Sequence, residues 1–155
     1  MLTILSVPFY SSSINSLLSI VQQWISHNKK KYICVTNTYV VAEAQRNNTF
    51  LQILKTSGMN VADGMPLVWI GKTLGYSQIE RAYGPMLMKR ICGICEQRGY
   101  KIFLYGTTIS TLSLLIKQLK QQFPKLIIAG FFAPPFRPLS TKENRGVYKK
   151  INASG

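Results

Sequence analysis

Acidic residues are scarce in this sequence, which limits the chemistry it can perform. The 155 residues include 5 Asp and Glu against 19 Lys and Arg, a formal net charge of +14 at pH 7. Asp63 is the only aspartate, and the acids are scattered along the chain. We therefore expect no carboxylate cluster for a divalent cation, and no cofactor. Chemistry on phosphates would depend on Arg, Lys, backbone N–H groups and helix dipoles.

Cysteine and histidine are also rare. Three Cys, an odd number, do not form a disulfide framework in a chain of this length, which favours a reducing cytoplasm. Cys92 and Cys95 form a lone C-x-x-C inside a helical pattern, far in sequence from the only histidine, His27. This favours buried thiols, with a metal or redox centre as the alternative. No Ser/His/acid or Cys/His catalytic set is evident, and His27 is placed as a helix C-terminal charge would be.

Long apolar runs and a leader segment are missing as well. No apolar stretch approaches the ~18–20 residues that a membrane-spanning helix needs. The first residues carry no basic segment and no small-residue cleavage site, so we expect no secretory signal. A hydrophobic content of 46% excludes a disordered or fibrous chain, and the length fits a single domain over residues 1–155.

The positive charge indicates anionic partners. Nucleotide or lipid diphosphates, an acidic membrane surface and nucleic acid all fit a charge of this sign. Two basic clusters stand out, Lys29–Lys31 and a C-terminal set of Lys142, Arg145, Lys149 and Lys150. Each is typical of a solvated face or, alternatively, of a contact with acidic lipid. Charge alone does not choose among these partners.

Segments typical of strands alternate with segments typical of helices. Strands are predicted over residues 3–8, 31–36, 59–62, 101–105 and 126–131. Helices are predicted over residues 14–26, 37–46, 49–56, 66–74, 85–98, 110–123 and 141–152. This alternation predicts an α/β fold with a parallel sheet.

The carboxyl ends of the predicted strands are the expected ligand-binding edge. Ligands of parallel α/β sheets bind there because helix N-termini present free N–H groups. Four segments follow predicted strands in this chain, namely Asn37–Thr38, Asp63–Gly64, Gly106–Thr108 and Phe132–Pro135. They come from four separate crossings, and we expect them to line one cleft.

Asp63 is the main candidate for catalysis. It follows a predicted strand and precedes Gly64. A carboxylate at such a position can be partly desolvated, which raises its pKa and makes it a usable general base. Asp-Gly is also common in turns, and Asp is a good helix N-cap, so both structural roles are alternatives.

A polar patch is predicted around Glu80 and Arg81, together with Tyr83 and Gly84. Arg81 could bind a diphosphate through two hydrogen bonds, and Gly84 would let a helix N-terminus approach closely. A surface salt bridge is the alternative. Asn37 could bind a sugar or a base, or could cap a helix.

Tyr105–Thr108 forms a strand–turn–helix element with one glycine. Backbone N–H groups at Gly106 and the hydroxyl of Thr107 could face a phosphate. The element is not the G-x-G-x-x-G fingerprint, which argues against a dinucleotide cofactor.

Several of these residues lie in stretches that match a known family. The stretches are Val35–Asn37, Ala62–Val68, Glu80–Pro85, Phe103–Gly106 and Pro134–Leu139. In their order, and in the spacing from Asn37 to Asp63 and on to Arg81, the chain resembles the WecG/TagA/CpsF glycosyltransferase family. The resemblance runs from Ile4 to Gly155.

The resemblance implies a Rossmann-like parallel sheet with helices on both faces. It also implies inverting, metal-independent transfer of an N-acetylhexosamine-type sugar in cell-surface polysaccharide or teichoic acid synthesis. The donor is a UDP-sugar, often UDP-N-acetylmannosamine, and the acceptor is a polyprenyl-diphosphate-linked sugar on the cytoplasmic membrane surface. By resemblance Asp63 is the general base, Arg81 a cation near a diphosphate and Asn37 a cleft residue. Six further residues are expected to contact substrate: Thr38, Gly64, Tyr83, Gly84, Gly106 and Thr107.

The sequence departs from the family pattern at three places. Met86 stands where an Asp is usual, which removes a polar group from the cleft, and Ser6 stands where glycine is common. Relatives continue beyond the position of Gly155 into a further strand and a membrane-associating tail, which help to bind the nucleotide and the lipid. We therefore expect this chain to be the N-terminal and central portion of the family fold, with an exposed sheet edge that favours homo-oligomers.

Other functions remain as alternatives. A basic nucleic-acid-binding domain fits the charge of +14 but lacks an aromatic-plus-basic stripe and a helix-turn-helix, so we expect no nucleic acid partner. A nucleotide-cofactor oxidoreductase lacks the glycine fingerprint. A non-catalytic remnant would keep the cleft without turnover.

Overall fold

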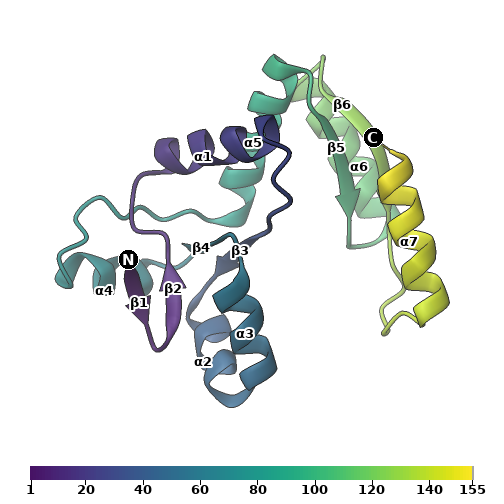
Figure 1. Ribbon diagram of the computed structural model, residues 1–155. Coiled ribbons are helices and arrows are strands. Elements are labelled where there is room, and N and C mark those ends of the chain that lie inside the picture. Colours follow the sequence, from purple (N-terminus) through teal and green to yellow (C-terminus); the bar gives the residue numbers. More distant parts are fainter. Residues whose placement is uncertain (155) are drawn as a thin grey trace. The chain divides into compact units, whose positions relative to one another are not determined.

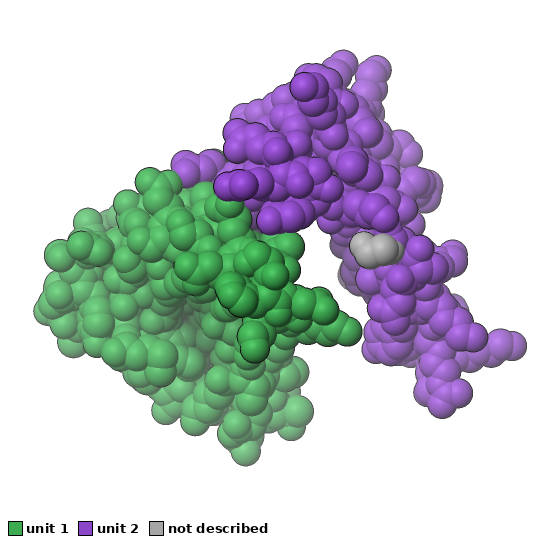
Figure 2. Space-filling view, turned by 45° about the horizontal axis from the view of Figure 1, so that its top comes forward, with its two compact units in different colours: residues 1–87 green, residues 88–155 purple. Residues whose placement is uncertain are grey.

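The computed structural model describes residues 1–154, and Figure 1 shows their helices and strands. The chain divides into two units, Met1–Leu87 and Met88–Gly155, which Figure 2 colours separately. Each unit has its own parallel strand pair and its own buried apolar cluster. The division falls inside the helix α5 (Gly84–Arg98).

The first unit contains four strands and four helices before α5. They are β1 (Leu2–Ile4), β2 (Val7–Phe9), α1 (Ile14–Ser26), β3 (Ile33–Thr36), α2 (Thr38–Arg46), α3 (Asn48–Thr56), β4 (Met59–Ala62) and α4 (Met65–Thr73). The predicted helices over 14–26, 37–46, 49–56 and 66–74 are confirmed to within two residues at each end. So is the strand over 59–62, while β3 begins two residues after its predicted start.

The predicted single strand over 3–8 is wrong. β1 and β2 pair in antiparallel fashion as a hairpin, because Leu5 and Ser6 turn the chain with φ of 47° and 64°. Two successive left-handed residues are the hallmark of the tight turn that best matches strand twist. Glycine adopts such angles most readily, and Ser6 adopts one here without being glycine.

Polar side chains start three of the helices of this unit. Ser13, Asn37 and Asn47 each accept a hydrogen bond from the backbone N–H three residues on, at the starts of α1, α2 and α3. These bonds satisfy N–H groups that have no partner within the helix. At the other end of α1, His27 is the C-cap, in agreement with its predicted place at a helix end.

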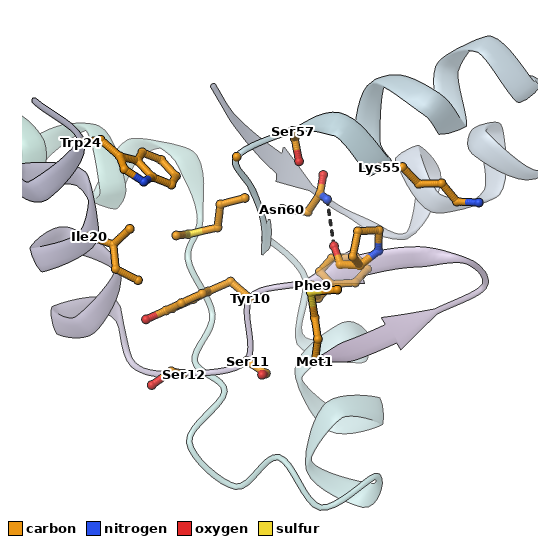
Figure 3. Close-up of a pocket in the computed structure, with 13 residues that line it drawn as sticks. Met1, Phe9, Tyr10, Ser11, Ser12, Ile20, Trp24, Lys55, Ser57 and Asn60 are labelled. Atoms are coloured by element: carbon orange, nitrogen blue, oxygen red, sulfur yellow. Dashed lines mark hydrogen bonds between the residues drawn. The ribbon is translucent and has the colours of Figure 1, made fainter. Parts of the chain in front are cut away.

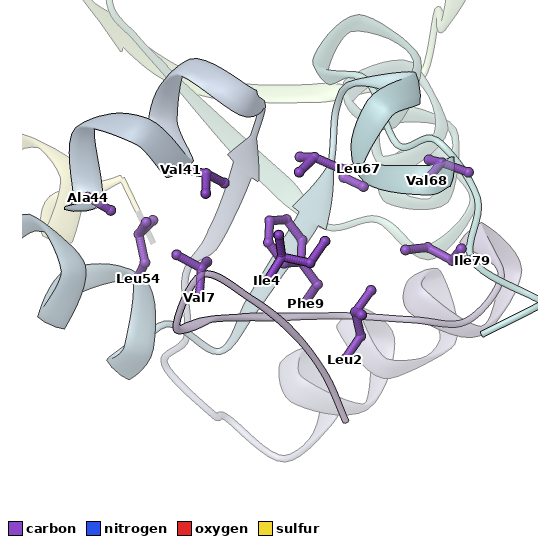
Figure 4. Packing of buried hydrophobic residues seen from close by; sticks show 11 residues of the cluster. Leu2, Ile4, Val7, Phe9, Val41, Ala44, Leu54, Leu67, Val68 and Ile79 are labelled. Atoms are coloured by element: carbon purple, nitrogen blue, oxygen red, sulfur yellow. The ribbon is translucent and has the colours of Figure 1, made fainter. Parts of the chain in front are cut away.

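The core of the first unit lies between the hairpin, β4 and the helices α2, α3 and α4. All four residues of β4 are buried, as expected for a strand covered on both faces. Figure 4 shows side chains from these elements meeting around Phe9, with Leu67 and Val68 pointing inward from α4. This packing fixes β4, and with it the position of the residues that follow its carboxyl end.

The second unit is smaller. After α5 it contains β5 (Lys101–Tyr105), α6 (Ile109–Gln122), β6 (Ile127–Phe132) and α7 (Thr141–Ala153). These bounds confirm the predicted elements over 85–98, 101–105, 110–123, 126–131 and 141–152 to within one residue at each end. β5 and β6 are parallel, with an irregularity in register between Ile102 and Phe103.

Cys92 and Cys95 contribute to the core of this second unit, as predicted for buried thiols. They are 2% and 4% exposed, and both are free thiols. Burial raises the pKa of the Cys92 thiol, and burial together with the neighbouring Cys92 raises the pKa of Cys95 to about 11. Both side chains are therefore neutral packing groups at physiological pH.

The α/β class is confirmed, but its strands are less connected than predicted. Among residues 1–154 the strands form three two-stranded sheets: β1 with β2, β3 with β4 and β5 with β6. Two of these pairs are parallel, as the alternation of strands and helices predicts. A continuous parallel sheet is not seen in this part of the chain.

Candidate functional site

Asp63 lies at the carboxyl end of the parallel pair β3–β4. Thr36 and Ala62 are partners at the ends of the two strands, and the backbone N–H of Asp63 donates to the carbonyl of Thr36 at 2.9 Å. The Asp63 side chain is 29% exposed. Its alternative role as a helix cap is wrong, because the N-cap of α4 is Gly64, with no side-chain hydrogen bond. The carboxylate is therefore left at the surface, at the strand end.

Arg81 is held beside Asp63 by the segment that leads into α5. Ile79 and Ala82 are each 2% exposed and anchor this segment, and the N–H of Ala82 donates to the carbonyl of Ala62 at 2.8 Å. Nε of Arg81 donates to the backbone carbonyl of Asp63 at 2.8 Å, and its Nη2 is 4.0 Å from Oδ1 of Asp63. Arg81 and Asp63 are therefore neighbours at the carboxyl end of β4.

The guanidinium of Arg81 also lies over an aromatic ring. Its Cζ is 5.1 Å from the ring centroid of Tyr83, a cation–π contact. The side chain is nevertheless 49% exposed, so an anion could reach it. The alternative predicted for this patch, a surface salt bridge, is present between Arg81 and Asp63. Glu80 is used elsewhere, since its Oε2 accepts from the backbone N–H of Ile14 at 2.9 Å.

Asn37 and Thr38 follow the neighbouring strand end. Oδ1 of Asn37 accepts from the N–H of Val40 at 3.0 Å, so its predicted capping role is confirmed. Thr38 is the first residue of α2, and both residues are exposed. A Cβ placed on Gly84 would meet only the side chain of Val35, at 3.9 Å. A larger residue would therefore fit at position 84 without a clash, and the glycine leaves open space beside β3.

The carboxyl end of β5–β6 in the second unit has a different character. Gly106 and Thr107 both have positive φ, 125° and 53°, and the N–H of Gly106 donates to the carbonyl of Phe132 at 3.0 Å. Thr108 caps α6 by accepting from the N–H of Thr111. A hollow of about 750 Å³ opens here. It is lined by Thr107, Thr108, Ile109, Ala133, Pro134, Pro135 and Phe136.

Two aromatic rings and a lysine adjoin this end. The rings of Tyr105 and Phe132 stack with centroids 6.0 Å apart, and Nζ of Lys150 lies 5.1 Å from the Phe132 centroid. The sequence analysis missed this stacking. Tyr105 and Phe132 are the final residues of the two paired strands, so their neighbourhood could have been inferred from the strand register. Lys150 is one of the four residues predicted as a basic cluster on the last helix.

The structure thus brings together the predicted site residues within each unit. Asn37, Thr38, Asp63, Gly64 and Arg81 gather at one strand pair, and Tyr83 and Gly84 follow directly. Gly106 and Thr107 lie at the other pair, beside the predicted segment 132–135. A single cleft lined by all four segments stays a prediction.

A separate hollow of about 480 Å³ opens at the amino end of β4 (Figure 3). Ile20 and Trp24 of α1 line one side of it, and Asn60 lines it from β4. The amide nitrogen of Asn60 donates to the carbonyls of Pro8 and Leu54, both at 2.8 Å, and so ties the hairpin and α3 to β4. None of the predicted site residues lines this hollow.

In residues 1–154, no three His, Cys, Asp or Glu side chains form a group that could hold a metal ion. No helix in this range is long and apolar enough to cross a membrane.

Comparison with known proteins gives a consistent match. The model of the glycosyl transferase WecG/TagA/CpsF family matches residues 2–155. A relative from Bacillus spizizenii is 26% identical over 147 residues, which are 94% of this chain and 55% of that protein. A relative from Bacillus subtilis is 21% identical over 130 residues, 83% of this chain and 51% of that protein. Both relatives are named N-acetylglucosaminyldiphosphoundecaprenol N-acetyl-beta-D-mannosaminyltransferase, and this chain spans about half of their length.

Proposed function

Because the chain belongs to the WecG/TagA/CpsF glycosyltransferase family, we propose that it takes part in moving an N-acetylhexosamine-type sugar from a UDP-sugar to a lipid-diphosphate-linked sugar. The names of the two relatives support an N-acetylmannosamine group as the sugar and a diphosphoundecaprenol-linked N-acetylglucosamine as the acceptor. The product would serve cell-surface polysaccharide or teichoic acid synthesis.

The observation that carries this proposal is the juxtaposition of Asp63 and Arg81. Asp63 is a surface carboxylate at a parallel strand end, and Arg81 lies beside it, half exposed and fixed by a 2.8 Å hydrogen bond. A general base and a cation at one edge suit a reaction in which a hydroxyl attacks and a phosphate leaves.

We propose a single in-line displacement with inversion. The acceptor hydroxyl oxygen forms a bond to the anomeric carbon, while the bond from that carbon to the UDP oxygen breaks. Asp63 takes the hydroxyl proton, and the electron pair leaves with UDP. Arg81 stabilises negative charge on a diphosphate, and the reaction requires no metal because cationic side chains and helix N-termini supply this stabilisation.

The remaining candidates would position the two substrates. Asn37 and Thr38 follow β3, Gly64 follows Asp63, and Tyr83 and Gly84 follow Arg81 closely in the chain. In the second unit Thr107 lines the hollow, and Gly106 directly precedes Thr107. We also propose that residues 1–155 act as one domain in which the parallel pairs belong to a Rossmann-like sheet. The acceptor would place the protein on the cytoplasmic surface of the cell membrane.

The test is a transfer assay with defined substrates. The chain is incubated with UDP-N-acetylmannosamine and a lipid-diphosphate N-acetylglucosamine, with and without EDTA, and the product is separated by chromatography. We expect a disaccharide-lipid with inverted anomeric configuration in NMR, formed equally in EDTA. Transfer with retained configuration, or transfer that EDTA abolishes, would contradict the mechanism.

A binding measurement separates the enzyme from a non-catalytic remnant. Calorimetric titration with UDP and UDP-N-acetylhexosamines is performed on this chain and on a version extended at its carboxyl end with the segment of a relative. Binding and turnover in both forms support the proposal for this chain. Binding without turnover in this chain, with turnover in the extended one, would assign it the remnant role.

A further inference from the structure

Helix α4 is apolar on both of its faces, yet only one face is covered. Leu67 and Val68 point into the core and are 1% and 2% exposed (Figure 4), and Gly71 is buried as well. The opposite side carries further large apolar side chains. We call them the outer face of α4: Met65, Pro66, Trp69 and Ile70, with Leu74 at the C-cap.

The apolar side chains of the outer face are unusually exposed to solvent. Trp69 is 60% exposed, Leu74 57%, Ile70 40% and Met65 38%. Only Lys72 and Thr73, both in the last turn, are polar in α4, and a helix that is apolar on all sides is normally covered on every side. Exposed apolar groups that stand together mark interaction surfaces, whereas single ones need no explanation. Leu114 on α6 is such a single case, since it is 65% exposed among Ser110, Lys117 and Gln118.

The outer face begins at the candidate site. Gly64, the N-cap of α4, directly follows Asp63. At a rise of about 1.5 Å per residue, Trp69 lies roughly 7–8 Å along the helix axis from Gly64, and Leu74 lies about 15 Å from it. The apolar surface therefore starts within one to two helical turns of the carboxylate that would receive the acceptor hydroxyl.

The proposed acceptor, like this part of the protein surface, is polar at one end and apolar at the other. A sugar comes first, a diphosphate second and a long apolar chain last. With the sugar hydroxyl of the acceptor at Asp63, the apolar chain of the acceptor must leave the site along a surface that tolerates it. The outer face of α4 is an apolar path that begins at this site.

We propose that the outer face of α4 docks on the lipid surface that holds the acceptor, an inference that rests on the proposed function. Trp is favoured at the boundary between acyl chains and headgroups, and Ile, Met and Leu enter the apolar layer beside it. Lys72 flanks this face in the last turn of α4, and its charge suits an anionic headgroup, as does the chain's net charge of +14.

The binding test uses the two tryptophans of the chain. Trp24→Phe leaves Trp69 as the only indole, and its fluorescence is recorded with vesicles of phosphatidylcholine and phosphatidylglycerol. Docking predicts a blue shift of the emission and co-sedimentation. Trp69→Ser should weaken vesicle binding by about tenfold or more, because the largest apolar group of the surface is lost. Leu114→Ser, a matched change at an exposed single residue, should alter binding by less than about twofold.

A transfer arm separates this inference from the proposed function. Turnover is compared on a vesicle-embedded polyprenyl acceptor and on a soluble acceptor with a short alkyl chain. Trp69→Ser should lower the ratio of the two rates, and Leu114→Ser should leave it unchanged. If the unmodified chain uses neither acceptor but still binds vesicles through Trp69, the proposed function fails and the docking surface stands.

Two outcomes would overturn the docking surface. One is an emission of Trp69 that vesicles do not shift, with equal vesicle binding by Trp69→Ser and the parent chain. The other is a dimer in light scattering that Trp69→Ser dissolves while vesicles bind neither form, which would assign the outer face to a second copy of the chain.

Discussion

The two parallel strand pairs have the same local architecture, but they carry different kinds of side chain at their carboxyl ends. At β3–β4 the chain presents a carboxylate and a guanidinium, those of Asp63 and Arg81, with Nη2 of Arg81 4.0 Å from Oδ1 of Asp63 and its Nε bonded to the backbone carbonyl of Asp63 at 2.8 Å. At β5–β6 it presents stacked aromatic rings, threonine hydroxyls and a backbone in the left-handed region. The first end is suited to proton transfer, and the second to holding a ligand by shape and backbone.

This difference arises because both acidic side chains of the second unit are held in local contacts. Oε1 of Glu96 accepts from the backbone N–H of Lys125 at 2.8 Å, and Glu143 pairs with Arg137 at 2.7 Å. Both carboxylates already serve the local structure. In the first unit, by contrast, Asp63 is not used as a helix cap, and it is the proton acceptor that we propose.

The largest expected effect is that of Asp63→Asn on transfer. Loss of a general base typically lowers the rate by about 10²–10⁴-fold. The amide is isosteric and the Asp63 backbone bonds remain, so thermal unfolding should be unchanged. Glu80→Gln removes one negative charge nearby while keeping the oxygen that accepts from Ile14, and should retain transfer. Near-normal transfer by Asp63→Asn would move the catalytic role elsewhere.

A smaller effect on transfer is expected from a change at Arg81, the cation at the carboxyl end of β3–β4. Arg81→Lys loses the Nε–H bond to the Asp63 carbonyl and the planar fork that matches a diphosphate. We expect kcat/KM to fall by about tenfold to a hundredfold, the cost of one to two charge-assisted hydrogen bonds. Arg46→Lys, an exposed exchange in the last turn of α2, is the control. Equal kinetics for both variants would show that Arg81 does not contact substrate.

The left-handed turn at the carboxyl end of β5–β6 can be tested by measuring stability instead of activity. Gly106 has a φ of 125°, which side chains rarely adopt, so Gly106→Ala should lower the free energy of unfolding by about 1–3 kcal/mol. Gly146→Ala lies inside α7 with nothing within 4 Å, and should instead raise it by about 0.5–1 kcal/mol. Denaturant titration of both variants measures these changes. Equal and small effects would mean that this end does not depend on its left-handed turn.

Most helices and buried strands were predictable because their signals are local. Ser13 before an amphipathic run predicts the start of α1, and Asn37 the start of α2. The alternation of strand and helix segments likewise predicted that strands are parallel, but not which strands pair. The hairpin was not predictable in this way, because Leu5-Ser6 lacks the Asn-Gly or Asp-Gly signal of a tight turn.

The candidate site was predictable in part. Strand ends locate Asp63 and Asn37, but no local signal places Arg81 beside Asp63, eighteen residues earlier. That contact depends on Ile79 and Ala82 packing into the core, which is a tertiary effect. The ion pair of Arg137 with Glu143 was missed although a signal existed. Ser140 and Glu143 form a capping box, whose S-x-x-E spacing is visible in the sequence.

The smallest expected effect concerns this ion pair and acid pH. The hydrogen bond from Arg137, with those from Ser140, lowers the pKa of Glu143 from 4.5 to about 2. A carboxyl group whose pKa is lower in the folded state stabilises that state above its ordinary pKa. This contribution is complete above about pH 4.5 and is lost as the pH falls toward about 2.

Glu143→Gln should therefore be slightly less stable than the parent chain at pH 7, and the difference should vanish as the pH approaches 2. Both side chains are exposed, at 56% for Arg137 and 39% for Glu143, so solvent and salt screen the pair. Thermal unfolding of the two proteins across this pH range measures the difference. Glu96→Gln is the control in the same unit, and a difference at Glu143 that persists to pH 2 would mean that the stabilisation does not come from its charge.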